Sequence, residues 1–176
     1  MILACFCDSA KCRIESCDSW SVVKLAELIK EIATDADFEA RNRNRAVRVV
    51  TAENCEIIGD ESLLRSAIEN VVRNAIRYTA EGTEVEISVF RHSTKEQLPI
   101  EITVRDHGSG VPEASLDKLF RPFYRVADAR DRQSGGAGLG LSITERAINL
   151  HSGTVSATNA PDQGLIVSLR LPETIS

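Results

Sequence analysis

The chain has 176 residues, of which 43% are hydrophobic and 27% charged, a composition typical of a single soluble globular domain. Its formal net charge of −5 argues against a general nucleic-acid-binding protein. No apolar run approaches the roughly 20 residues that a membrane-spanning helix requires, and the first residues lack the features of a secretory signal, so we expect a cytoplasmic polypeptide.

The first 17 residues hold most of the cysteines and show no helical or strand periodicity. Their spacing lacks the paired C-x2-C arrangement of zinc sites and no histidine lies near them, so reduced thiols in a frayed N-terminus are favoured over a metal site. We therefore expect residues 1–20 to be a leader or the remnant of a preceding domain, and residues 21–176 to form the folded domain.

The first part of this domain shows two helical patterns separated by strands. Apolar residues at spacings of three and four predict an amphipathic helix over residues 21–41. The arginine-rich stretch ARNRNRAVR that follows is most simply a solvated helix end and turn. Short strands are predicted over residues 48–51 and 55–58, and Asp60 is a plausible N-cap for a helix over residues 61–79.

The second part contains two predicted hairpins. The alternating segments EVEISVF and PIEITVRD predict the first. A short helix over residues 113–119 and a mobile, arginine-rich loop over residues 121–136 follow, and GLGLSITERAINLH predicts a helix that starts on a glycine-rich turn. GTVSATNA and GLIVSLRLP predict the last hairpin. The mixture predicts an α+β fold, a two-layer sandwich with three main helices on a mixed, largely antiparallel sheet.

The helix over residues 61–79 carries a polar group at the edge of its apolar face. At roughly 100° per residue, Asn70, Asn74 and Arg77 project together, with Tyr78 close by. The amide oxygens are ligands of the kind that Mg²⁺ accepts while keeping waters and substrate phosphates, and Arg77 is placed to hold a phosphate oxygen. Taken alone, such a group is more often a set of ordinary surface amides.

Two glycine-bearing stretches supply further candidate ligands. In DHGSG, Asp106 ends a strand as a fixed acceptor for an amine such as that of adenine, although turn statistics alone favour an Asx-type turn. In GGAGLGL the glycines open onto a helix N-terminus, where unpaired N–H groups favour phosphate, and a flexible hinge is an equally weighted alternative. One ligand, Mg·ATP, accounts for both stretches and for the asparagine pair.

These motifs resemble a known family, the catalytic and ATP-binding domain of bacterial sensor histidine kinases, which has the Bergerat or GHKL fold. IENVVRNAIRY is similar to the family's N box, DHGSG to its first glycine box, LFRPFYR to its F box and GAGLGL to its second glycine box. A third glycine box survives weakly at Gly164. The motifs stand in the family's order and span residues 21–172, and FRPFYRVADARDRQSGGAGLGL looks nearest to envelope-stress kinases of the Cpx type.

The resemblance implies a role for each motif. Asn74 would ligate Mg²⁺ with Asn70 in support, Arg77 would contact phosphate, Tyr78 would line the nucleotide and Asp106 would bind the adenine amine. The remaining implied positions give room to the nucleotide, hold its phosphates, or anchor and charge a lid over it: Gly108, Gly110, Phe120, Phe123, Arg125, Gly136, Gly138, Leu139, Gly140 and Leu141.

The sequence departs from the family pattern at several positions. The usual threonine of the second glycine box is Ala137, and a threonine that often follows the third is Leu165, so two hydroxyls near the nucleotide are missing. Relatives that hydrolyse ATP, such as gyrase and Hsp90, carry a glutamate base where this chain has Asn70. Because an amide cannot take a proton from water, little intrinsic ATPase activity is predicted. None of the three histidines lies in a phosphoacceptor motif.

The resemblance therefore implies the catalytic half of a kinase that uses ATP and Mg²⁺ to phosphorylate a histidine on a separate helical-hairpin domain, with a response regulator downstream. Residues 1–20 would be the tail of that hairpin or a foreign leader, and the full-length protein would sit in the inner membrane with this domain in the cytoplasm. Because the hairpin builds the dimer, the isolated domain would be monomeric. Two alternatives share the fold: an anti-sigma-type protein-serine kinase and a non-catalytic nucleotide-binding module.

Overall fold

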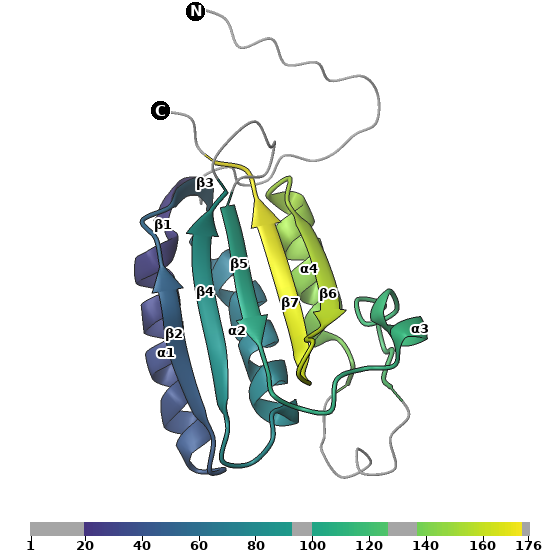
Figure 1. The fold of residues 1–176 in the computed structure, drawn as a ribbon. Coiled ribbons are helices and arrows are strands. Elements are labelled where there is room, and N and C mark those ends of the chain that lie inside the picture. Colours follow the sequence, from purple (N-terminus) through teal and green to yellow (C-terminus); the bar gives the residue numbers. More distant parts are fainter. Residues whose placement is uncertain (1–19, 93–99, 127–136, 174–176) are drawn as a thin grey trace, which may run out of the picture.

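The computed structural model describes residues 20–92, 100–126 and 137–173 (Figure 1). Over those ranges no helix is both long and apolar enough to cross a membrane. The elements in chain order are β1 (Trp20–Lys24), α1 (Leu25–Arg41), β2 (Ala46–Ala52), β3 (Glu56–Asp60), α2 (Glu61–Tyr78), β4 (Glu84–Arg91), β5 (Ile100–Arg105), α3 (Glu113–Leu116), α4 (Gly140–Leu150), β6 (Thr154–Asn159) and β7 (Leu165–Leu171).

The main sheet has five strands in the order β2-β4-β5-β7-β6. β2 runs parallel to β4, and every other neighbouring pair in this sheet is antiparallel. Figure 1 shows α1, α2 and α4 on one side of the sheet. The predicted α+β two-layer sandwich, with three main helices on a mixed, largely antiparallel sheet, is therefore confirmed.

The hydrophobic core lies between the helices and the sheet, because each element buries one face. On β4 the alternate residues Val85, Ile87 and Val89 are buried, while Glu84 and Glu86 on the opposite face stay partly exposed, as strand periodicity requires. The buried stripe of α2 consists of Leu64, Ala67, Ile68, Val71, Val72, Ala75 and Ile76. The polar edge of α2 is thereby placed at the rim of the core.

The predicted start of the first helix is wrong. Residues 20–24 form β1, which pairs antiparallel with β3 in a separate two-stranded sheet, and α1 begins only at Leu25. In that pairing Val23 lies opposite Ile57, and both side chains are buried. The apolar spacing around Val23 fits a strand as well as a helix, and the distant strand β3 decides between them. Because β1 starts at Trp20, the expected boundary between leader and domain falls inside this strand.

The other predicted strands and long helices are confirmed, with ends that differ by a few residues. Helix α3 stops at Leu116, and residues 127–136 of the predicted mobile loop lie outside the described residues. The prediction that the arginines after α1 are simply solvated is wrong for Arg45. Its Nη1 atom donates to the carbonyl oxygens of Ile76 at 2.7 Å and Arg77 at 3.2 Å, which are backbone acceptors at the end of α2.

A buried histidine fixes the other end of α2. His151 is 3% exposed; its Nδ1 atom donates to the Ala147 carbonyl at 2.7 Å, and its Nε2 atom accepts from the Asp60 backbone N–H at 3.0 Å. The ring also stacks on Trp20, with 5.0 Å between ring centroids. The Oδ1 atom of Asp60 accepts from Leu63 N–H at 3.1 Å, which is the predicted N-cap. The imidazole therefore holds the start of the helix that carries the candidate site.

Candidate functional site

Helix α2 presents the polar residues that the sequence singled out. Asn70 and Asn74 are half-buried and lie one turn apart on the same side of the helix. A Cβ atom added at Gly140 would lie 3.6 Å from Asn70 Oδ1, so the start of α4 packs against this amide. Arg77 is half-buried, and its Cζ atom lies 5.4 Å from the centroid of the Tyr78 ring, within cation–π range. This edge of α2 therefore borders the second glycine box.

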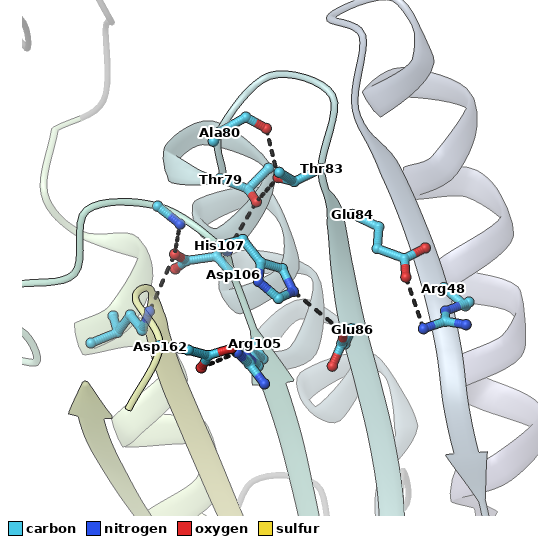
Figure 2. A network of polar contacts seen from close by, with 12 residues as sticks. Arg48, Thr79, Ala80, Thr83, Glu84, Glu86, Arg105, Asp106, His107 and Asp162 are labelled. Carbon is cyan, nitrogen blue, oxygen red and sulfur yellow. Dashed lines mark hydrogen bonds and ion pairs between the residues drawn. The ribbon is translucent and has the colours of Figure 1, made fainter. Parts of the chain in front are cut away.

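The carboxylate of Asp106, directly after β5, is held by backbone donors. The residue is 4% exposed, and its Oδ1 atom accepts from the N–H groups of Gly108 at 2.8 Å and Leu165 at 3.2 Å (Figure 2). Burial raises the pKa of this carboxyl above its usual value, and the two N–H donors oppose that shift. Among the described residues, none donates a hydrogen bond to Oδ2.

The third glycine box is clearer in the structure than in the sequence. Gly164 has a φ of +101°, and a Cβ atom added there would lie 1.8 Å from the Asp106 carbonyl oxygen, so this position requires glycine. The backbone N–H of Asp106 donates to the Leu165 carbonyl at 3.0 Å. Leu165 lacks the expected hydroxyl, but its backbone N–H supplies a hydrogen bond to the carboxylate instead.

The first glycine box rests on the C-terminal end of α2. A Cβ atom added at Gly108 would lie 2.3 Å from the Tyr78 carbonyl oxygen, so a larger residue would push the two segments apart. One residue further, Thr79 is buried, and its Oγ1 atom accepts from the His107 backbone N–H at 3.0 Å. Sequence reasoning missed Thr79, because its local signal is just a hydroxyl residue after a helix end. Gly110, also in this box, has a φ of +70°.

The F box and the second glycine box meet through their backbones. Phe123 donates its N–H to the Gly138 carbonyl at 2.9 Å. Phe123 is 72% exposed, whereas Phe120 is buried in the core and anchors the segment. Arg125 is exposed on the same stretch. Gly136, another predicted phosphate ligand, lies outside the described residues.

The start of α4 offers backbone donors beside α2. Leu139 occupies the N-cap position and makes no capping hydrogen bond, and within the described ranges no side chain accepts from the first N–H groups of α4, from Gly140 onward. Leu141 packs against the core. The buried Thr144 donates its hydroxyl to the Ala67 carbonyl at 2.9 Å, which ties α4 to α2. An anion at this helix start would therefore lie close to the asparagine pair.

The contacts bring together three motifs that are distant in the sequence. Helix α2 touches the second glycine box through Asn70 and the first through the Tyr78 carbonyl. The described part of the chain contains no cluster of three or more His, Cys, Asp or Glu side chains that could hold a metal ion. The amide oxygens of Asn70 and Asn74, together with oxygens of water and a ligand, are donors that could hold a divalent ion. That donor set fits Mg²⁺ carried by a triphosphate.

Comparison with known proteins places these motifs in one family. Residues 59–175 match the family described as histidine kinase-, DNA gyrase B- and HSP90-like ATPase. The sensor histidine kinase CpxA of Escherichia coli K12 is 40% identical over 151 residues, which is 85% of this chain and 32% of CpxA. The chain thus spans about a third of the length of the curated relatives it matches.

Two examples illustrate the solved structures that share the fold. The ATP-binding domain of PrrB from Mycobacterium tuberculosis is 30% identical with a TM-score of 0.68, and the match covers 90% of this chain and 100% of that one. The mycobacterial sensor histidine kinase MprB is 25% identical with a TM-score of 0.75, and the match covers 89% of this chain and 100% of that one.

Proposed function

The chain belongs to the histidine kinase-, DNA gyrase B- and HSP90-like ATPase family, and from that premise we propose that it binds Mg·ATP and transfers the γ-phosphate to a histidine on a separate domain. It is an ATP-binding catalytic domain of the sensor histidine kinase type. None of its own three histidines lies in a phosphoacceptor motif, so the proposed acceptor is a helical-hairpin dimerisation domain of the full-length kinase.

The observation that carries the proposal is the contact of α2 with both glycine loops. Asn70 lies against Gly140 at the start of α4, and the Tyr78 carbonyl lies against Gly108. A nucleotide bridging these contacts would place its base near Asp106 and its phosphates near α4. In the proposed complex the adenine amine donates to Oδ2 of Asp106, the oxygen to which no residue in the described part of the chain donates.

The phosphate half of the proposed site is built from α2 and α4. Asn74 ligates Mg²⁺ with Asn70 in support, and Arg77 holds a phosphate oxygen. The N–H groups at the start of α4 donate to further phosphate oxygens, and Tyr78 lines the nucleotide. When bound, Mg²⁺ would neutralise the charge that develops on the phosphate oxygens.

Phosphoryl transfer of this kind requires alignment and charge neutralisation more than a protein nucleophile. The acceptor imidazole uses a ring-nitrogen lone pair to form the new N–P bond, and the bond between the γ-phosphorus and the bridging oxygen breaks so that ADP leaves. The other ring nitrogen gives its proton to water. Asn70 stands where ATP-hydrolysing relatives carry a glutamate base. Its amide cannot take a proton from water, so we propose that this site favours transfer over hydrolysis.

The wider setting follows from the same proposal. A response regulator would receive the phosphate from the acceptor histidine. The catalytic domain would face the cytoplasm, where ATP is available, within a full-length kinase held in the inner membrane. The isolated domain would be monomeric, because the hairpin domain builds the dimer.

Binding of Mg·ATP to wild type and to Asn74→Ala tests the metal role by calorimetric titration. We expect a loss of affinity of about tenfold with Mg²⁺ and a smaller loss with the chelator EDTA present, because an amide ligand to a charged ion is removed. Asn149→Ala, an exposed asparagine on α4, is the matched control and should bind as wild type. Equal affinity of wild type and Asn74→Ala in Mg²⁺ would remove the metal role of Asn74.

Phosphotransfer is tested separately with γ-labelled ATP and a purified hairpin domain from a relative such as CpxA. Label that is lost in acid and kept in base identifies a phosphohistidine, and this is the expected result. Label that survives acid on a serine substrate would support the protein-serine kinase alternative. Nucleotide binding without label on any acceptor would leave a non-catalytic binding module.

A further inference from the structure

A chain of hydrogen bonds beneath the first glycine box supports an inference that rests on the proposed function. The His107 backbone N–H donates to Thr79 Oγ1 at 3.0 Å. Thr79 Oγ1 lies 2.8 Å from Thr83 Oγ1, and Thr83 Oγ1 donates to the Ala80 carbonyl at 2.6 Å. Figure 2 shows this chain running from His107 to the turn before β4.

Counting the hydroxyl protons fixes which group donates and which accepts at each step of this series of hydrogen bonds. A carbonyl oxygen can only accept, so the single hydroxyl proton of Thr83 points to Ala80. Thr83 Oγ1 must then accept the proton of Thr79, which leaves the Thr79 oxygen as the acceptor for His107 N–H. Thr79 is 1% exposed, so water cannot readily replace a lost partner there.

A second bond ties the same segments together. The Ala80 backbone N–H donates to the His107 carbonyl at 3.4 Å, so both backbone groups of His107 are held by the two residues that follow α2. His107 lies between Asp106 and Gly108, whose N–H donates to the Asp106 carboxylate. The Thr79 hydroxyl therefore sets how closely this loop approaches the end of α2, and with it the position of the carboxylate.

We propose that Thr79 is a positioning residue for recognition of the adenine base. Through the His107 N–H it holds the Asp106 carboxylate where the 6-amino group of adenine can donate to it. Guanine carries a carbonyl oxygen at that position, which a carboxylate repels, so the preference for ATP over GTP depends on Thr79. The phosphate half of the site is held through other contacts, such as that of Asn70 with Gly140.

Competition of ATP and GTP against a fluorescent ATP analogue measures this preference in the whole chain. Thr79→Val keeps the shape of the side chain and removes the acceptor of a buried N–H group, so the ATP-to-GTP affinity ratio should fall about tenfold. Thr79→Ser keeps the hydroxyl and should restore the ratio. Thr144→Val is the matched control: it removes another buried hydroxyl, on the phosphate side, and should affect both nucleotides equally, leaving the ratio unchanged.

The outcomes separate the inference from the proposed function. A folded Thr79→Val variant with the wild-type ratio would overturn the inference and leave ATP binding intact. A wild-type chain that binds neither nucleotide would overturn the proposed function and the inference together. Where circular dichroism shows that Thr79→Val does not fold, Thr83→Val carries the test, because it frees the Thr79 hydroxyl to rotate. The ATP-to-GTP affinity ratio of Thr83→Val should also fall, and an unchanged ratio would overturn the inference.

Discussion

Replacing Asp106 with asparagine should separate two functions of one side chain, holding the glycine loops together and receiving the nucleotide. Its Oδ1 atom accepts the N–H groups of Gly108 and Leu165. Asparagine keeps an acceptor oxygen for both donors but replaces Oδ2 with an NH₂ group. We therefore expect Asp106→Asn to fold and to lose its acceptor for the adenine amine.

The expected magnitudes follow from these contacts. Hydrogen bonds to a charged acceptor are worth roughly 1.5–3 kcal/mol and neutral ones about 0.5–1.5 kcal/mol, so Asp106→Asn weakens each of the two bonds by about 1 kcal/mol. Burial of the Asp106 carboxylate changes the stability difference between wild type and Asp106→Asn in the opposite direction. Because the pKa of Asp106 is raised in the folded state, its ionisation lowers stability at pH values above the folded pKa, and asparagine removes that cost. Asp106→Ala instead leaves two buried N–H groups without an acceptor and should cost about 2–6 kcal/mol.

Urea unfolding at neutral pH and calorimetric titration with Mg·ATP measure the two effects. Asp106→Asn should unfold near the wild-type midpoint and bind ATP about tenfold to 150-fold more weakly, the equivalent of one lost charged hydrogen bond. Asp106→Ala should unfold at a much lower urea concentration. If Asp106→Asn and Asp106→Ala are equally unstable in urea, Oδ1 does not hold the loops together. If Asp106→Asn binds ATP with wild-type affinity, the adenine contact is refuted.

Three further predictions concern the supports of the site. Arg45→Met removes the guanidinium from the carbonyls at the end of α2 and should lower the free energy of unfolding in urea by about 1–3 kcal/mol. The Val47 N–H lowers the pKa of Asp37, so Asp37 stabilises the fold above its usual pKa of 3.8 and loses that effect as pH falls through the folded pKa. Asp37→Ala should therefore cost about 1 kcal/mol in urea unfolding at neutral pH and much less near pH 2. Gly164→Ala should cost more than about 3 kcal/mol, because its Cβ atom would lie 1.8 Å from the Asp106 carbonyl, and a nearly unchanged thermal midpoint would contradict that geometry.

The elements that the sequence predicts well are those whose signals are local. Helix α2 has a continuous apolar stripe, and its cap at Asp60 lies within one turn of the residue it binds, Leu63. Strand β1 has no such signal: Val23 is read as helical until Ile57 of β3 is placed beside it. The role of Arg45 is hidden for the same reason, since its acceptors belong to a helix end far along the chain.

The candidate site divides in the same way. Asn70, Asp106 and the glycine boxes could be singled out as candidates, because their residue types and spacings are unusual in a plain scaffold, and their binding roles stay predictions. The contribution of Leu165 could not, because a backbone N–H belongs to every residue except proline and leaves no mark in the sequence. Thr79 also escaped notice, since a threonine after a helix gains significance only when the His107 backbone is brought to it.

The backbone hydrogen bond between Phe123 and Gly138 joins the two ends of the segment between them. The entropy of closing a loop rises slowly with its length, by about 0.6 kcal/mol for each doubling. The two anchors therefore keep the F box beside the start of α4 at an entropic cost that depends only weakly on the number of residues between them.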